Sequence, residues 1–407
     1  MRHLLVSVLC VAACSSRPQP AARSRVLQSG GIHTVFLIML ENHSWSQIKG
    51  SSSAPYINGS LLPQASHAEN YRNPGYLHPS LPNYLWLEAG TNFGVQADGD
   101  PSSYHQAATQ HFVTLLQAAG YSWKSYQEDI DGTSCPLTST GKYAPKHNGP
   151  IYFDDVTNSN DSSSANCIAH FRPYGELATD LASGAVPNFV YITPNLCDDM
   201  HDSLGCSSSD SIKNGDSWLS SEVPKILASG AWQNGGALFI TWDESEASED
   251  PMGMLVLSPL AKGNGYASTV NYTHSSTLRT FEEIFGLSPF LGGAANAADL
   301  SDMFQDSLAQ ACTADAECGS GQVCASGRCQ ANPPAGSCQS DSDCSGGLAC
   351  VTGTCQGRPS SSCPPGTTDI GGTCVPTGCS SSQGGSVSLL ALALAVALAM
   401  RARRRSA

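Results

Sequence analysis

Four runs of mainly apolar residues constrain the fold of this chain more than any other feature. They read TVFLIML (34–40), NFVYIT (188–193), GALFITW (236–242) and GMLVLSPL (253–260). Helical patterns alternate with them, for example HFVTLLQAAG (111–120) and STLRTFEEIFG (276–286). Strands that are apolar along their whole length are typical of a mostly parallel sheet with helices on both faces. The sequence therefore predicts an α/β domain over residues 31–307.

Polar side chains follow three of these runs directly. They are Glu41, Asn42, Asp199, His201, Asp202, Asp243 and Glu244. The carboxyl ends of parallel strands meet at one edge of a sheet, where α/β enzymes bind their ligands. Carboxylates gathered there repel one another unless a cation lies between them, and oxygen ligands with some imidazole suit a divalent metal. We therefore expect a divalent metal ion, of unknown identity and number.

Ser80 is the candidate nucleophile, in the segment GYLHPSLPNYLWLEAGTNFG (75–94). It lies in a loop ahead of a helical pattern, and Pro79 and Pro82 restrict the backbone around it. A serine hydroxyl bound to a metal can lose its proton and attack phosphorus, while a helix N-terminus and the Asn83 amide bind phosphoryl oxygens. The alternative is that Ser80 only caps a helix, and local sequence alone favours that alternative.

Seven short segments together resemble a known family. They occur in the order ENHS, HPSLPNY, YAPKHNGPIYF, ITPNLCDDMHD, GDSWL, ITWDE and HSSTLRTFEEIFGL. The set resembles the phosphoesterase family that contains secreted acid phosphatases and phosphatidylcholine-type phospholipases C, and it extends from about Ile32 to Phe290. The resemblance implies an alkaline-phosphatase-like α/β core and a metal-assisted serine or threonine nucleophile.

The resemblance also assigns roles to individual residues. Two pairs match metal-binding positions of the family: Glu41 with Asn42, and Asp243 with Glu244. Ser80, itself also a metal ligand, matches the nucleophile, and Asn83 matches an amide that binds a phosphoryl oxygen. A further set would hold a second metal or contact phosphate and the leaving group: Asp199, His201, Asp202 and His274. Lys146 and His147 match a pair that lies near the phosphate.

Hydrolysis of phosphate monoesters is the function that these residues predict. The enzymatic alternative is a phospholipase C acting on phospholipid head groups. An alternative of another class is a non-catalytic surface binding protein on the same fold, against which the intact set of site residues argues. A formal net charge of −14 makes nucleic acid an unsuitable partner.

Both termini predict export to the outer membrane or cell surface. Residues 1–13 read as a secretory signal peptide, and VAAC ending at Cys14 resembles a lipobox; ordinary cleavage nearby is the alternative. Residues 14–30 form a linker. Residues 380–407 combine an apolar run with an Arg cluster, and resemble a myxobacterial-type C-terminal sorting tail cut by a membrane protease near Cys379. The alternative is a permanent membrane anchor.

The number and spacing of the cysteines predict disulfides in an oxidising compartment. The chain has 17, and residues 308–379 contain two copies of the spacing C-x5-C-x5-C-x4-C, beginning at Cys312 and Cys338. Each copy has too few apolar residues for a core, so we interpret this region as a disulfide-stapled stalk and disfavour zinc. In the large domain, we expect Cys197 and Cys206 to close the loop that carries His201.

Overall fold

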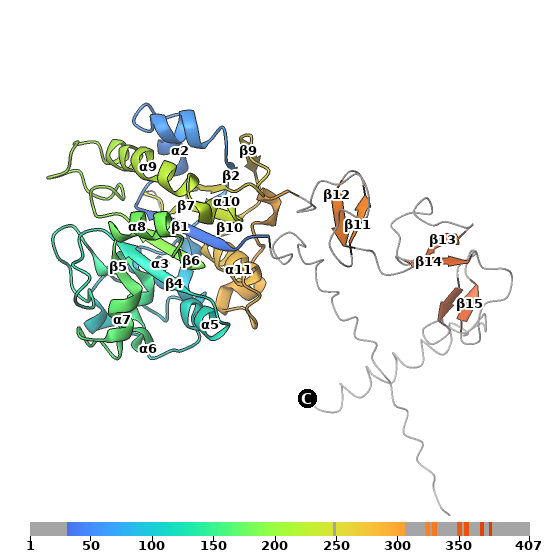
Figure 1. The fold of residues 1–407 in the computed structure, drawn as a ribbon, viewed down its shortest axis with the longest axis horizontal. Coiled ribbons are helices and arrows are strands. Elements are labelled where there is room, and N and C mark those ends of the chain that lie inside the picture. Colours follow the sequence, from blue (N-terminus) through green and yellow to red (C-terminus); the bar gives the residue numbers. More distant parts are fainter. Residues whose placement is uncertain are drawn as a thin grey trace, which may run out of the picture. The chain divides into compact units, whose positions relative to one another are not determined.

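The computed structural model of the protein describes residues 31–246 and 250–305, together with six short strands between Gln322 and Pro376. The chain divides into two compact units after Leu308 (Figure 1). In the part that is described, no helix is long and apolar enough to cross a membrane. The predicted signal peptide, linker and sorting tail lie outside the described residues.

An eight-stranded sheet forms the centre of the first unit. In spatial order its strands are β5 (Phe171–Pro173), β4 (Trp123–Gln127), β6 (Phe189–Thr193), β1 (Thr34–Leu40), β7 (Gly236–Trp242), β8 (Met254–Leu257), β2 (Ser66–Ala68) and β9 (Tyr266–Ser268). All strands of this sheet run parallel except β8, which is antiparallel to both β7 and β2. A small parallel pair joins β3 (Tyr71–Arg72) and β10 (Tyr272–Thr273).

The central strands are buried along their whole length. Every residue of β1, β6 and β7 is buried, as the unbroken apolar runs predict. Side chains on both faces of these strands are covered, so the sheet must have helices on both sides. The predicted α/β class with a mostly parallel sheet is confirmed.

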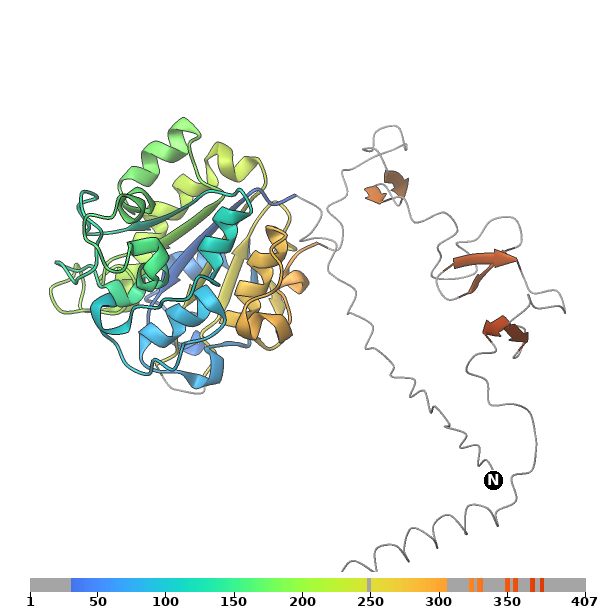
Figure 2. The ribbon, with the colours of Figure 1, turned by 90° about the horizontal axis from the view of Figure 1, so that it is seen from below.

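Helices cover both faces of the sheet (Figure 2). On one face α3 (Ser80–Ala89) contacts α5 (Phe112–Ala118) and α11 (His274–Ile284). On the other face α9 (Ser211–Leu227) contacts α8 (Glu176–Ser183) and α10 (Gly230–Gln233). Shorter helices and helical turns complete the unit: α2 (Trp45–Ile48), α4 (Pro101–Tyr104), α6 (Asp154–Thr157), α7 (Ala165–His170), η1 (Ile57–Leu61), η2 (Pro74–Tyr76), η3 (Pro145–His147), η4 (Gly149–Tyr152), η5 (Gly292–Asn296) and η6 (Ser301–Met303).

In the second unit, the described residues form three two-stranded antiparallel hairpins. They pair β11 (Gln322–Ala325) with β12 (Arg328–Ala331), β13 (Leu348–Val351) with β14 (Thr354–Gly357), and β15 (Thr367–Asp369) with β16 (Cys374–Pro376). The first two hairpins occupy equivalent positions in the two sequence repeats, with Cys324 opposite Cys329 and Cys350 opposite Cys355.

Candidate active site

The candidate site forms where β1 and β7 end side by side. Leu40 and Trp242, the last residues of the two strands, are partners in the parallel register. The N–H of Asp243 donates to the carbonyl of Leu40 at 3.0 Å, and the N–H of Asn42 donates to Asp243 Oδ1 at 3.2 Å. Asn42 adopts a left-handed backbone conformation (φ 48°), which asparagine tolerates better than most residues. Backbone pairing thus places Glu41, Asn42 and Asp243 together.

Ser80 is the first residue of α3, and Pro79 is the N-cap. Its side chain makes no helix-capping bond; instead Ser80 Oγ donates to Glu41 Oε2 at 3.0 Å, and both residues are buried. The alternative in which Ser80 only caps a helix is therefore wrong. The structure brings the predicted nucleophile onto the first predicted metal ligand, across 39 residues of sequence.

Several groups converge on a single oxygen atom, Glu41 Oε2. Besides Ser80 Oγ, His147 Nε2 lies 3.3 Å away and the Asn42 side-chain amide lies 3.2 Å away. The Asn42 amide can have two orientations. With its nitrogen towards the carboxylates, it donates to both Glu41 and Asp243; with its oxygen there, that oxygen faces two carboxylate oxygens. The second arrangement requires a cation between the three oxygens.

The pKa values of four carboxyl groups in the site are raised above their ordinary values. Burial, followed by repulsion from neighbouring carboxylates, raises the pKa of Glu41 well above its usual value. Burial raises the pKa of Asp243 to about 7, and burial together with the charge of Asp243 raises the pKa of Glu244 to about 9. Burial is also the first cause that raises the pKa of Asp199. The charge of Lys146 opposes these shifts without cancelling them, and a bound divalent cation would supply further positive charge.

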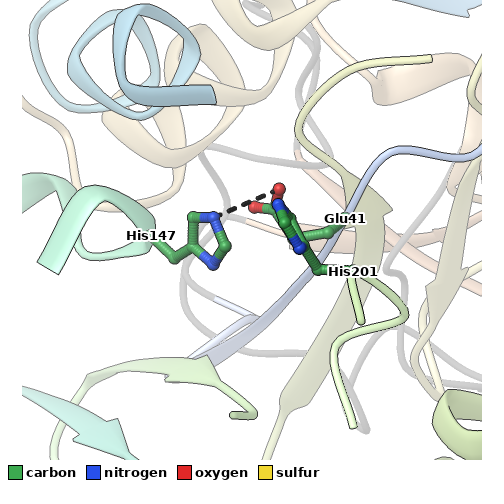
Figure 3. A group of neighbouring side chains, drawn as sticks. All are labelled: Glu41, His147 and His201. Atoms are coloured by element: carbon green, nitrogen blue, oxygen red, sulfur yellow. Dashed lines mark ion pairs between the residues drawn. The ribbon is translucent and has the colours of Figure 1, made fainter. Parts of the chain in front are cut away.

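Two histidines lie beside Glu41 (Figure 3). Glu41, His147 and His201 each place one ligand atom so that the three atoms lie within 4.8 Å of one another. Burial holds the pKa of His147 well below its usual range, so the ring is neutral, the form of imidazole that binds metals. This is the group of acidic, histidine or cysteine side chains among the described residues that meets the geometry of a metal site.

Asp199 supports both histidines from the loop after β6. Its Oδ2 lies 3.1 Å from His147 Nδ1, and its Oδ1 accepts the backbone N–H of His201 at 2.8 Å. The backbone carbonyl of Asp199 accepts the N–H of Glu41 at 2.7 Å. Asp199 therefore orients the surrounding groups, and its role as a metal ligand stays a prediction.

Asp202 does not converge on this group. Its Oδ1 lies 3.0 Å from His201 Nδ1, and its Oδ2 pairs with Lys142 Nζ at 3.0 Å. One oxygen therefore contacts His201, a member of the cluster around Glu41, and the other contacts Lys142; that Asp202 itself is a metal ligand stays a prediction. A carboxylate on one ring nitrogen fixes the ring and leaves the other nitrogen facing the site.

Glu244 points towards the segment before Ser80. Asn83 Nδ2 donates to Glu244 Oε2 at 3.0 Å, and His78 Nδ1 lies 3.1 Å from the same oxygen. Asn83 Nδ2 also donates to the carbonyl of Leu77, while Asn83 Oδ1 is buried without a hydrogen-bond partner. The structure therefore brings Asn83 and Glu244 together beside Ser80, as one side of the candidate site.

Lys146 lies beside the N-terminus of α3 and is paired with an acidic residue. Its Nζ lies 2.8 Å from Asp98 Oδ2, and Asp98 Oδ1 accepts the N–H of Leu81 at 3.0 Å. Burial alone would lower the pKa of Lys146, but Asp98, Glu41 and Asp243 outweigh burial and raise it. Lys146 is thus a permanent positive charge next to Ser80, with Asp98 as its partner.

His274 lies behind Asp243 and is fully buried. Its Nε2 lies 2.6 Å from the carbonyl oxygen of Asp243, and its Nδ1 lies 3.0 Å from the hydroxyl of Tyr71. Both ring nitrogens are engaged with protein groups, so the structure does not place His274 among the groups that face Ser80. This geometry differs from the expected contact with phosphate, and it braces the backbone that carries Asp243.

The predicted disulfide between Cys197 and Cys206 is present, and a second disulfide joins Cys135 and Cys167. The first closes the loop that contains Asp199, His201 and Asp202, as expected. Sequence reasoning missed three site neighbours: His78, Tyr84 and Asp98. Tyr84 follows Ser80 by one helical turn, and this spacing is the signal that identifies it.

A known family matches most of the α/β domain. The model of the Phosphoesterase family matches residues 69–288, just over half of the chain. The chain belongs to the Phosphoesterase family. It is accordingly a phosphoric ester hydrolase. Residues 311–356, which contain both cysteine repeats, match a Domain of unknown function (DUF7107).

Curated relatives of this phosphoesterase are named as phosphatases. The phosphatidylinositol-3-phosphatase of Mycobacterium tuberculosis is 30% identical over 273 residues, covering 67% of this chain and 83% of the relative. The probable acid phosphatase of Kluyveromyces lactis is 28% identical over 279 residues, covering 65% and 61%. The phosphate-repressible acid phosphatase of Penicillium chrysogenum is 28% identical over 240 residues, covering 56% and 54%. The chain thus spans little more than half of each fungal relative.

Solved structures that align with this phosphoesterase include a protein in the alkaline phosphatase superfamily from Vibrio parahaemolyticus. It is 9% identical, with a TM-score of 0.43, covering 69% of this chain and 79% of that one. The phosphonate monoester hydrolase of Agrobacterium radiobacter is 12% identical, with a TM-score of 0.44, covering 67% and 77%. TM-scores below 0.5 do not by themselves establish a common fold.

Proposed function

We propose that this chain is an exported, metal-dependent phosphoesterase that hydrolyses phosphate monoesters with Ser80 as the nucleophile. The observation that carries the proposal is the contact of Ser80 Oγ with Glu41 Oε2 at 3.0 Å, in a buried cluster of carboxylates at the carboxyl edge of the sheet. A buried serine hydroxyl that faces only uncharged groups would have no means of activation; this one faces the predicted metal ligands.

The residues present fit a divalent cation. Asp243 Oδ2 and His147 Nε2 are buried without hydrogen-bond partners, and the pKa values of the surrounding carboxyl groups are raised. We propose that Glu41, Asn42, Asp243, Glu244 and Ser80 hold the ion, with His147 and His201 available beside Glu41. When bound, the ion stabilises the ionised form of the Ser80 hydroxyl and neutralises the carboxylates.

The chain's own residues account for the covalent steps. The Ser80 hydroxyl would give its proton to Glu41 Oε2, its acceptor in the structure, as Oγ forms a bond to phosphorus. The bond between phosphorus and the ester oxygen breaks, giving a phosphoseryl intermediate and an alkoxide. The alkoxide takes a proton from a neighbouring group, for which His201 is our candidate because its side chain is partly exposed beside Glu41. Water then gives a proton to His201 and attacks phosphorus, and the bond between Ser80 Oγ and phosphorus breaks. Phosphate is released, and Ser80 Oγ takes its proton back from Glu41.

Positive and amide groups beside Ser80 would bind the phosphoryl oxygens. Lys146 carries a permanent charge there, and the Asn83 amide is adjacent to Ser80 on α3. Asp98 occupies one backbone N–H at the N-terminus of α3, so this terminus is not fully open to phosphate. We propose that Lys146, more than the helix N-terminus itself, provides these contacts. Asn83 Nδ2 donates to Glu244 and Leu77 in the structure, so it would have to leave one of these partners to donate to a phosphoryl oxygen as well.

Three substrates separate the candidate functions. The purified protein is assayed with p-nitrophenyl phosphate, bis-p-nitrophenyl phosphate and phosphatidylcholine, before and after chelation and with added divalent ions. Rapid hydrolysis of the monoester, lost on chelation and restored by an ion, supports the proposal. Preference for phosphatidylcholine supports the phospholipase C alternative, and no hydrolysis of any ester supports a binding protein. Activity that resists prolonged chelation in metal-free protein refutes the metal mechanism.

Phosphatidylinositol 3-phosphate is assayed as a fourth substrate because one relative is named phosphatidylinositol-3-phosphatase. The substrate in that name is a lipid whose head group carries a phosphate monoester. A monoesterase that acts on a lipid is therefore compatible with the same site. Hydrolysis of phosphatidylinositol 3-phosphate with no activity on phosphatidylcholine would assign this chain to that class.

Surface attachment is the remaining part of the proposal. A lipid on Cys14, the C-terminal tail, or both would attach the enzyme to the outer membrane or cell surface, and a sorting protease would process the tail near Cys379. The segments concerned lie outside the described residues, so the proposal rests on their sequence.

A further inference from the structure

One turn of α3 presents two hydroxyl groups to the same carboxylate. Ser80 Oγ donates to Glu41 Oε2 at 3.0 Å, and the hydroxyl of Tyr84 donates to Glu41 Oε1. Residues four apart lie on the same face of a helix, so this double contact follows from the spacing of the two residues. Each oxygen of Glu41 therefore has its own hydroxyl donor, and both donors come from one rigid element.

The ring of Tyr84 has a second contact in the site. It stacks on the imidazole of His147, with ring centroids 5.5 Å apart and an interplanar angle of 15°. His147 Nε2 faces Glu41 Oε2 at 3.3 Å and His147 Nδ1 faces Asp199 Oδ2 at 3.1 Å. The stacked ring fixes the plane in which both nitrogens lie. Tyr84 is itself 1% exposed, so it contacts the site from behind and does not line its opening.

We propose that Tyr84 is the positioning residue that makes Glu41 a one-oxygen metal ligand. Its hydroxyl occupies Oε1 and directs Oε2 towards Ser80, Asn42 and His147, while its ring sets the orientation of His147. This inference rests on the proposed metal-dependent function, and it assigns to Tyr84 no contact with the substrate.

Burial explains why the hydroxyl is required. Glu41 is fully buried, and Tyr84 is the hydrogen-bond donor to its Oε1. Without that donor, Oε1 becomes an unsatisfied buried acceptor, and the carboxylate has reason to rotate towards other donors or to bind a proton. Losing a residue that orients a metal ligand typically lowers metal affinity or activity by about 10-fold to 100-fold.

Tyr84→Phe tests the hydroxyl alone, because phenylalanine retains the ring that stacks on His147. The matched control is Tyr126→Phe, which also removes a buried tyrosine hydroxyl that donates to a carboxylate, that of Asp180 on α8. Tyr84→Leu removes both the hydroxyl and the stacked ring. Zn²⁺, Mn²⁺ and Ca²⁺ are titrated by calorimetry into each chelator-treated full-length protein, and p-nitrophenyl phosphate hydrolysis is measured against metal concentration.

We expect Tyr84→Phe to bind the activating ion about 10-fold to 100-fold more weakly than the wild type, and to recover most of its turnover at saturating metal. Tyr126→Phe should bind the ion as the wild type does. Tyr84→Leu should lose affinity further and should not recover at saturating metal, because the orientation of His147 is also lost.

The possible failures are distinguishable. A wild type that neither binds a divalent ion nor hydrolyses the ester refutes the proposed function itself. A metal-dependent wild type with a Tyr84→Phe variant of equal affinity refutes only the role of Tyr84. Equal losses in Tyr84→Phe and Tyr126→Phe would show a general effect on stability, which also overturns the inference; thermal unfolding of the metal-free proteins measures that effect directly.

Discussion

A buried histidine away from the site gives a quantitative prediction about stability. His111 Nδ1 lies 2.7 Å from Glu88 Oε1 on α3, and His111 Nε2 lies 2.9 Å from Asp155 Oδ1 on α6. Thr114 on α5 also contacts Nε2, and the ring stacks on Phe153 with centroids 3.8 Å apart. With a carboxylate at each nitrogen, the ring is most stable as the doubly protonated cation.

The free energy follows from the shift in pKa. Burial alone would lower the pKa of His111, but the hydrogen bonds to Asp155 and Glu88 outweigh burial and raise it from 6.5 to about 9. At about 1.4 kcal/mol per pH unit, this corresponds to roughly 3 kcal/mol. Because the folded pKa is raised, the contribution is fully present below pH 6.5 and is lost as the pH rises through about 9.

His111→Gln removes this contribution, and urea unfolding followed by tryptophan fluorescence measures it. The wild type should exceed the variant by roughly 3 kcal/mol at pH 6, and the gap should shrink towards zero at pH 10. His105→Gln is the matched control, since His105 Nδ1 lies 2.9 Å from Asp154 Oδ1 at an exposed position, where such pairs contribute about 1 kcal/mol or less. A gap at His111 that changes by less than about 1 kcal/mol between the two pH values would refute the reasoning.

Three other predictions concern catalysis, the disulfide-closed loop and processing. Ser80→Ala should retain the fold and lower turnover on the order of a thousandfold, and acid-quenched wild type should yield a labelled peptide containing Ser80; near-normal turnover in the variant would exclude this nucleophile. Replacing Cys197 and Cys206 by serine should destabilise the loop by about 2–3 kcal/mol and lower kcat more than it raises KM. A variant with wild-type kinetics would show that the disulfide does not position His201. Mass spectrometry of surface material should find mature protein without residues 1–13 and without the Arg-rich end, whereas an intact RARRRSA terminus would contradict processing.

The sheet could be predicted where apolar runs are unbroken, and less well elsewhere. The runs at 34–40, 188–193 and 236–242 became β1, β6 and β7, because strands buried on both faces contain almost no polar residues. β4, with the sequence WKSYQ, was not predicted, because polar residues interrupt its apolar pattern. One of them, Lys124, is half-buried and pairs with Asp180. The run at 253–260 was correctly read as a strand, but its direction is set by the short connection from β7, which the apolar pattern does not encode.

The candidate site could be predicted as a set of residues but not as a set of contacts. Glu41, Asn42 and Asp243 came from strand ends, and the register of β1 and β7 brings them together as topology requires. Asp202 and His274 carry side chains of the right chemistry, yet tertiary partners, Lys142 for the first and Tyr71 for the second, determine where they point. No local sequence pattern specifies such partners, because they lie 60 and 203 residues away.

The reversed direction of β8 has a consequence for how this enzyme can diversify. A connection between parallel strands must cross from one edge of the sheet to the other, and it is tied to a helix along the way. The connection from β7 to antiparallel β8 begins and ends at the edge where Asp243 and Glu244 lie. Insertions and deletions between these two strands would therefore alter what surrounds the substrate without requiring any strand or helix to move.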